Sequence, residues 1–412
     1  MHIKPHWYSV AGLQILALFL ATEVQMLGGV RTDEAKYLLN IPYPHPPLMR
    51  WLMSATEVLP FQEIFWRVLL ATLLIQAVWL IWDMTRSMHH EDRIMVCAGW
   101  LLSAAVLTQA GAIMMAPVTA LQVLIFVWLM RRPEYVKKFP ALLALFWLAS
   151  LFTALQAVLF VPLIWILFRR NGQSRLKTAL YVLAPMGLLA LYALSNPLIL
   201  ATIFLKSHQG IGIAESTRST VFSEGSGLYA RGFGLVRLWL IGGAGIASVV
   251  GTWGIFKSKN AGLILSFLLL CAYLLLPPAQ PYYSILFTPL FVAGLFHIFH
   301  GKRHPHAFPL LGCLLFATAI FSWFARPELA PGSARTVMQA IEAVPGSGST
   351  ILIAGSFGHE WQYESHETIR RYRPEFVGDA RAVVCLQSCD PPFNTSGWKR
   401  LLNTPIETWI RK

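Results

Sequence analysis

Apolar residues in this sequence form long runs that short polar and basic segments separate. Because a helix rises about 1.5 Å per residue, about 20 apolar residues are needed to cross a hydrocarbon core about 30 Å thick. Such runs predict helical spans at about residues 8–30, 62–83, 94–115, 117–130, 178–204, 235–256, 261–277, 283–299 and 307–325. The pattern therefore predicts an all-α polytopic membrane protein.

One further apolar block, residues 141–168, has basic clusters on both sides. Basic loops stay on the cytoplasmic side of a membrane, so both clusters are expected there. Two short spans that turn near residues 150–156 satisfy this rule, whereas one long span does not. The chain then has about eleven spans and a cytoplasmic N-terminus in the inner membrane. Two large loops, 31–60 and 205–234, fall on the other side with the tail.

The last part of the chain is more polar and has a different pattern. Residues 349–354 and 382–386 predict strands, and residues 360–372 predict a helix between them. Alternation of strand and helix is typical of an α/β domain. We therefore expect a transmembrane domain at 1–325 and a small extracytoplasmic α/β domain at 326–412, with Pro327, Pro331 and Gly332 in the linker.

Composition agrees with the membrane class and excludes several others. Of 412 residues, 56% are hydrophobic and 13% are charged, whereas soluble domains carry about 25% charged residues. The net charge is +13, but the basic residues lie in short clusters between spans, which topology explains better than nucleic-acid binding. No Rossmann or P-loop pattern occurs, so the chain has no evident nucleotide site. No internal repeat occurs either, unlike transporters built from inverted halves.

The cysteines divide into two groups. Cys97, Cys271 and Cys313 lie in apolar runs and are expected to pack in the core. Cys385 and Cys389 lie in the polar tail and form a candidate disulfide if the tail is in an oxidising compartment. Two thiols at this spacing are too few for a dedicated zinc site.

The first large loop carries the candidate chemistry. Asp33 and Glu34 follow directly after the first span, where a carboxylate can act as a general base or orient an acceptor. The alternative is that both acids cap an interfacial helix together with Thr32. His45 is followed by Pro46 and Pro47, which hold the backbone extended and present the imidazole rigidly. Its alternative is an incidental histidine in a proline-rich turn.

These residues carry a resemblance to a known family. The order Asp33-Glu34-Ala-Lys-Tyr and then Tyr43-Pro-His-Pro-Pro-Leu resembles the first-loop signature of the GT-C membrane glycosyltransferases. Their lipid A aminoarabinose transferase and protein O-mannosyltransferase branches are the most similar. The resemblance implies inverting transfer of a sugar from a polyprenyl-phosphate donor to an extracytoplasmic lipid, protein or glycan. It also implies that Asp33 is the base or acceptor-orienting residue and that His45 faces the donor phosphate.

Further residues complete the expected site. Glu34 is a second catalytic candidate, and the expected phosphate-binding cations besides His45 are Arg50, Lys206, Arg218 and Arg231. The expected cavity is lined by aromatic side chains, namely Tyr37, Tyr43, Tyr282 and Tyr283. For the cations of the 205–234 loop, the alternative interpretation is that they belong to an ordinary solvated loop.

The sequence also departs from the family pattern at three positions. Pro44 and Val118 stand where the family usually carries an acidic residue, and Ala154 stands where a lysine is frequent. A divalent metal therefore remains an open question. The same departures keep a rival hypothesis open, in which the chain is a non-enzymatic transporter of lipid-linked sugar or a scaffold of the cell envelope.

Overall fold

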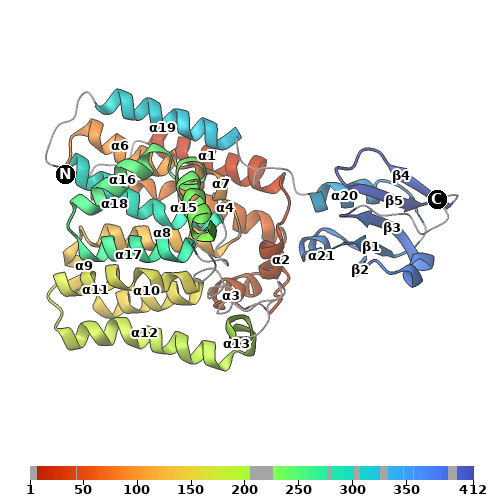
Figure 1. The fold of residues 1–412 in the computed structure, drawn as a ribbon, viewed down its shortest axis with the longest axis horizontal. Coiled ribbons are helices and arrows are strands. Elements are labelled where there is room, and N and C mark those ends of the chain that lie inside the picture. The colour runs from red at the N-terminus through yellow and green to blue at the C-terminus, as the bar shows by residue number, and fades with distance from the viewer. Residues whose placement is uncertain are drawn as a thin grey trace.

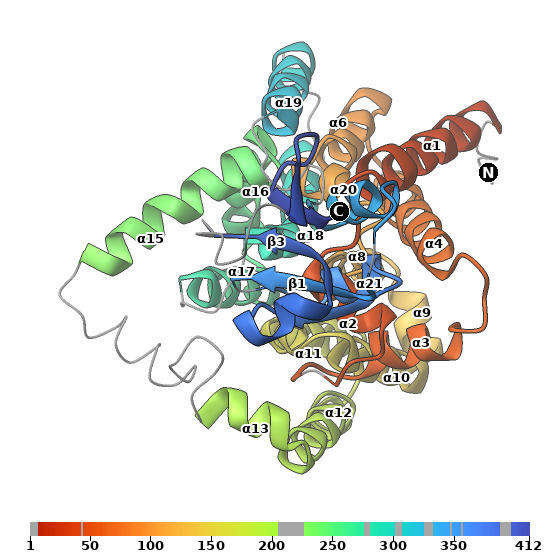
Figure 2. The ribbon, with the colours of Figure 1, turned by 90° about the vertical axis from the view of Figure 1, so that its right-hand side faces the viewer.

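The computed structural model describes residues 7–42, 44–204, 226–275, 281–300, 307–324, 333–346, 348–355, 357–387 and 397–412. Figure 1 shows a bundle of helices with a small sheet domain at one end. The short helices that follow the first span lie at that same end, next to the sheet domain, and Figure 2 shows α2 (Thr32–Leu38) beside α21 (Glu360–Glu364). The two parts predicted from composition are therefore both present.

The first half of the bundle contains regular helices and two helices of other types. In chain order these are α1 (Trp7–Phe19), the π-helix η1 (Leu20–Met26), α2 (Thr32–Leu38), α3 (Leu48–Ala55), α4 (Gln62–Gln76), α5 (Val78–Met84), α6 (His90–Leu101), α7 (Ala104–Gln109), α8 (Met115–Leu129), α9 (Pro133–Lys138), α10 (Pro140–Thr153), the 3₁₀ helix η2 (Leu155–Phe160) and α11 (Val161–Arg170).

The second half continues with α12 (Arg175–Ser195), α13 (Pro197–Phe204), α15 (Ser226–Arg237), the π-helix η3 (Leu238–Gly242), α16 (Ile246–Lys257), α17 (Ala261–Leu274), the 3₁₀ helix η4 (Pro281–Phe287), α18 (Thr288–Phe299) and α19 (Ala307–Phe324).

Among the described residues, four helical stretches are long and apolar enough to cross a membrane. They are Tyr8–Met26, Gln62–Met84, Arg175–Ser195 and Tyr282–Phe299. Shorter apolar helices occupy Met115–Leu129, Pro140–Thr153, Ile246–Lys257, Ala261–Leu274 and Leu310–Phe321. The polytopic helical pattern is thus found, while the number of eleven spans remains a prediction.

Several expected spans are interrupted, and polar contacts explain where. The expected span at residues 94–115 is divided into α6 and α7, because Ser103 adopts an extended backbone and its hydroxyl donates to the Gly243 carbonyl at 3.2 Å. The long apolar block breaks as expected. Helix α10 ends at Thr153, Ala154 is extended, and α11 begins only after η2. Both α10 and α11 pack against α12.

Small residues allow α16 and α18 to lie very close together. A Cβ placed on Gly294 would overlap the carbonyl oxygen of Gly251, and one placed on Gly254 would overlap the backbone of Gly294. Close backbone approach through glycine is a common way to pack helices where burial in lipid supplies no driving force. These glycines therefore fix the contact that holds the second half of the bundle together.

The tail forms a five-stranded mixed sheet in the order β2-β1-β3-β5-β4. The strands are β1 (Thr350–Ala354), β2 (Thr368–Arg371), β3 (Ala380–Cys385), β4 (Trp398–Leu401) and β5 (Glu407–Arg411), and the helices are α20 (Ser333–Glu342), α21 (Glu360–Glu364) and the 3₁₀ helix η6 (Pro374–Asp379). Strand β1 is parallel to β2 and β3, whereas β5 is antiparallel to β3 and β4. Helix α20 packs its apolar face, including Val337 and Ile341, on this sheet.

The sequence-based prediction for this domain was correct for two strands and wrong for the helix. Strands β1 and β3 lie where strands were expected. The expected helix at 360–372 ends at Glu364, because Ser365 is extended and the following segment pairs with β1 as edge strand β2. The linker residues Pro327, Pro331 and Gly332 lie outside the described residues, so the domain boundary stays a prediction.

Candidate functional site

Glu34 forms a buried ion pair at the start of α2. Its two carboxylate oxygens accept hydrogen bonds from Nη1 and Nη2 of Arg67 at 3.0 and 3.1 Å. The backbone N–H groups of Arg31 and Ile113 donate to the same carboxylate, each at 2.9 Å. Neither the Glu34 nor the Arg67 side chain is exposed. The hydrogen bond from the Arg31 N–H to Glu34 closes a helix-capping box. Of the two interpretations of Glu34 offered by the sequence, the structure therefore favours helix capping.

This environment keeps Glu34 ionised and engages both of its carboxylate oxygens in hydrogen bonds. Burial alone would raise the pKa of Glu34, but the charges of Arg67 and Arg31 and their hydrogen bonds hold it below its ordinary value. Both oxygens already accept two hydrogen bonds each. A carboxylate in this state has little capacity to take a proton from a substrate. We therefore assign Glu34 to positioning of the loop, and Asp33 becomes the carboxylate available for chemistry.

Asp33 lies one position away on α2 but faces a different environment. Its side chain is 29% exposed and contacts Nζ of Lys36 at 3.0 Å through Oδ1. The hydroxyl of Tyr282 donates to the other oxygen, Oδ2, at 3.4 Å. A partly exposed carboxylate between a lysine and a tyrosine can orient a hydroxyl or amine and accept its proton.

His45 lies beside this group as a neutral imidazole. Burial lowers the pKa of His45 to about 4, with the Asp33 charge raising it and the Lys36 charge lowering it. Its Nδ1 lies 3.0 Å from the sulfur of Met115, at the start of α8. Burial thus disfavours the cationic form of the ring. A neutral ring still has one N–H group to donate to a phosphate oxygen.

The expected aromatic residues come from two distant parts of the chain. Tyr37 of α2 and Tyr283 of η4 are both buried, and they lie close enough to interact electrostatically. The rings of Tyr282 and Tyr283 have centroids 4.6 Å apart. Gln109 holds this segment through a hydrogen bond to the Tyr282 carbonyl at 2.8 Å. The fold thus brings residues near 33 and near 282 together.

The expected phosphate-binding cations are only partly described. Arg50 is on α3, is partly exposed, and forms no ion pair with any described residue. Lys206 and Arg218 lie outside the described residues, as does Tyr43. Arg231 is on α15, but its side chain is not described. Binding of a lipid phosphate by these four cations remains a prediction.

The sheet domain contacts the same loop through a second set of charges. Arg335 of α20 pairs with Glu63 at 2.8 Å and with Glu364 at 2.9 Å. Glu364 accepts a hydrogen bond from the Val30 N–H at 2.9 Å, and the Thr32 hydroxyl donates to Glu360. Since Glu63 also pairs with Arg67 at 2.7 Å, the charges connect the sheet domain to the buried pair below Asp33.

The positions that depart from the family pattern supply no metal ligand. Val118 is a partly buried residue of α8, and Ala154 is buried at the break after α10. Within the described ranges, no three His, Cys, Asp or Glu side chains lie close enough to share a metal ion. In the tail, Cys385 is disulfide-bonded, and Cys389 lies outside the described residues, so their pairing remains a prediction.

The sequence assigned no role to two residues of the site. Lys36 and Met115 contact Asp33 and His45 directly. The i, i+3 spacing of Asp33 and Lys36 on one helix face is a signal that could have identified the lysine. Nothing in the sequence indicates the contact of Met115, because it depends on how α8 packs against the loop.

Known proteins match this chain in three dimensions but not in sequence. No family model matches it, and no curated protein sequence matches it. A crystal structure of ArnT from Cupriavidus metallidurans bound to undecaprenyl phosphate superposes with a TM-score of 0.60 at 10% identity, covering 98% of this chain and 97% of ArnT. The apo structure of the same protein gives a TM-score of 0.58 at 11% identity, with the same coverage.

The chain has the ArnT fold. ArnT is a lipid A aminoarabinose transferase of the GT-C type, so the expected fold is confirmed over nearly the whole chain. The match includes both the helical bundle and the C-terminal sheet. At 10% identity the similarity establishes the ArnT fold alone.

Proposed function

We propose that the chain is a membrane glycosyltransferase that transfers a sugar from a polyprenyl-phosphate donor to an extracytoplasmic acceptor. The observation that carries this proposal is the position of Asp33, partly exposed between Lys36 and Tyr282 with His45 beside it. Undecaprenyl phosphate in the ArnT crystal supports a lipid phosphate as the carrier. The acceptor class, lipid, protein or glycan, is not specified by these residues.

The proposed reaction is a single displacement with inversion. The acceptor hydroxyl or amine attacks the anomeric carbon, and the bond from that carbon to the phosphate oxygen breaks. Asp33 orients the acceptor and receives its proton, which then passes to water. The electron pair of the broken bond leaves with the polyprenyl phosphate. The N–H of neutral His45 and the cations Arg50, Lys206, Arg218 and Arg231 stabilise the departing phosphate.

The proposed orientation follows from charge. The loop that carries Asp33 lies at the same end of the bundle as the sheet domain, whereas α9, with Lys137 and Lys138, lies at the opposite end. Because basic loops stay in the cytoplasm, we place α9 and the N-terminus there. Asp33 and the sheet domain then face the periplasmic side of the inner membrane.

The test is release of free polyprenyl phosphate from a labelled donor by the purified protein. We expect Asp33→Asn to lower the rate by about 10²–10⁴-fold, the usual contribution of a general base, without changing thermal stability. Glu57→Gln is the matched control, because Glu57 is an exposed acid of the same loop. An Asp33→Asn variant with full transfer activity contradicts the assignment. Movement of intact donor across a vesicle membrane without cleavage supports the transporter hypothesis instead.

A further inference from the structure

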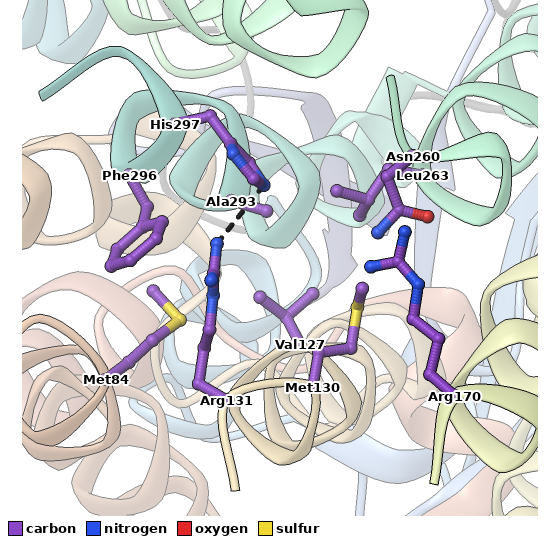
Figure 3. Close-up of a pocket in the computed structure, with 10 residues that line it drawn as sticks. All are labelled: Met84, Val127, Met130, Arg131, Arg170, Asn260, Leu263, Ala293, Phe296 and His297. Carbon is purple, nitrogen blue, oxygen red and sulfur yellow. Dashed lines mark hydrogen bonds between the residues drawn. The ribbon is translucent and has the colours of Figure 1, made fainter. Parts of the chain in front are cut away.

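A pocket opens where several helix ends meet, at the end of the bundle away from the sheet domain (Figure 3). Its walls come from the end of α5, the end of α8 and the turn after it, the end of α11, the start of α17 and the last turns of α18. The lining residues are Met84, Val127, Met130, Arg131, Arg170, Asn260, Leu263, Ala293, Phe296 and His297. The lining thus combines apolar and basic side chains and contains no acid.

Two guanidinium groups face this pocket, and neither has a carboxylate partner in the part of the chain that the structure describes. Arg131 lies over the ring of Phe296 at 4.0 Å, and its Nη2 is 3.3 Å from Nε2 of His297. Arg170 forms no hydrogen bond or ion pair with any side chain in the described part of the chain. Burial and then the charge of Arg170 lower the pKa of Arg131. The positive charges of Arg131 and Arg170 repel each other. An anion bound between the two guanidinium groups would offset this repulsion.

The third polar group is a buried amide that lacks an acceptor. Asn260 is only 1% exposed, and its Oδ1 accepts from the Gly262 N–H at 3.0 Å as the cap of α17. Because only the oxygen of an amide side chain can accept a hydrogen bond, this bond distinguishes Oδ1 from Nδ2. Its Nδ2 has no hydrogen-bond partner among the described residues, and Figure 3 shows the amide directed toward the guanidinium of Arg170. An unpaired buried N–H group is costly, so two donors that face each other need a common acceptor.

We propose that this pocket binds the phosphate of an anionic phospholipid. The phosphate oxygens accept from Arg131, Arg170 and Asn260, which satisfies the unpaired amide and separates the two positive charges. Met130 and Leu263 belong to the apolar part of the lining, and they would contact the glycerol and the first part of an acyl chain. Basic pockets between spanning helices on the cytoplasmic side are suited to anionic headgroups. The site lies at the far end of the bundle from Asp33 and does not depend on the proposed reaction.

The test measures lipid binding to the purified full-length chain by native mass spectrometry in a zwitterionic detergent. Phosphatidylglycerol and phosphatidylcholine of equal chain length are titrated separately, and inorganic phosphate is the third arm. We expect phosphatidylglycerol to bind at least about tenfold more tightly than phosphatidylcholine, because the choline cation of phosphatidylcholine adds a further positive charge beside Arg131 and Arg170. Asn260→Asp keeps the helix cap but pairs with Arg170 in place of the lipid, so it should weaken phosphatidylglycerol about tenfold. Arg170→Gln should do the same.

The control is Arg175→Gln, which removes one exposed cation at the same end of the bundle but outside the pocket lining. It should leave lipid binding unchanged. Equal weakening by Arg175→Gln, or none by Arg170→Gln, overturns the pocket. Binding of inorganic phosphate as tight as that of phosphatidylglycerol overturns the lipid assignment. If Asn260→Asp does not fold, Arg170→Gln decides the matter alone, because Arg170 is exposed and caps nothing.

Discussion

The guanidinium of Arg67 holds the carboxylate of Glu34 at two points, with distances of 3.0 and 3.1 Å and no exposure of either side chain. Glu34 belongs to the loop after the first span, and Arg67 belongs to the long helix α4–α5. Ile113, just before α8, donates its N–H to the same carboxylate. One ion pair therefore fixes three parts of the chain below Asp33.

Removal of the Glu34 charge should therefore destabilise the protein. Glu34→Gln leaves Arg67 buried with Glu63 as its one remaining carboxylate partner among the described residues, beside the carbonyls of Gly29 and Gly111. We expect a loss of about 3 kcal/mol, the low end of the range for breaking a buried pair, because Glu63 still compensates. Denaturant unfolding in detergent measures the change. Glu57→Gln makes the same substitution at an exposed position of the same loop and should alter stability by about 0.5 kcal/mol or less.

His45 should make stability depend on pH. Burial lowers the pKa of His45 from 6.5 to about 4, so the unfolded chain takes up its proton first as the pH falls. Stability is therefore lost on acidification from about pH 6.5 toward about pH 4. Thermal unfolding of the native protein and of His45→Gln should be compared over that range. The native protein should lose more stability than the variant, and parallel curves would exclude a neutral, partly buried His45.

The sequence predicted the general architecture because lipid imposes strong patterns. The apolar runs, the break near Ala154 and the strands β1 and β3 are all found. The expected helix at 360–372 was wrong, because pairing with β1 overrides a segment without clear apolar periodicity. Local signals cannot reveal that kind of competition, since the partner strand lies elsewhere in the chain.

The candidate site was predictable in its residues but not in their roles. The order of residues in the first loop indicated Asp33, Glu34 and His45, and the fold brings Tyr282 to Asp33. Adjacent acids look equivalent in sequence, yet successive helix positions differ by about 100° in direction. One faces Arg67 in the interior, and the other faces the partly exposed side. Only the position of α4 distinguishes them.

Arg335 should hold the sheet domain against the first loop. It pairs with Glu63 of the bundle and with Glu364, which in turn accepts the Val30 N–H. Arg335→Gln removes the charge that joins these two acids. We expect faster hydrogen exchange in peptides that contain Val30 and Glu364, because the contact opens more often. Arg371→Gln changes an exposed arginine of the same domain and should leave both peptides unchanged. Equal exchange in both variants would show that Arg335 does not hold the contact.

The cysteines allow the compartment of the tail to be tested. Cys97, Cys271 and Cys313 are free thiols, whereas Cys385 is disulfide-bonded. Protein from membranes that is denatured without reductant should therefore take up three maleimide tags, and reduced protein should take up five. Disulfides persist in the periplasm and are reduced in the cytosol, so three tags support a periplasmic tail.

The partner of Cys385 can be identified in the same experiment. If it is Cys389, then Cys385→Ser and Cys389→Ser should each take up four tags whether or not reductant is present, because each leaves the other thiol free. Cys313→Ser is the control and should lose one tag in both conditions, because Cys313 is already free. Five tags on unreduced native protein would place the tail in a reducing compartment. The proposed orientation of Asp33 would then be wrong, because the tail and the Asp33 loop lie at the same end of the bundle.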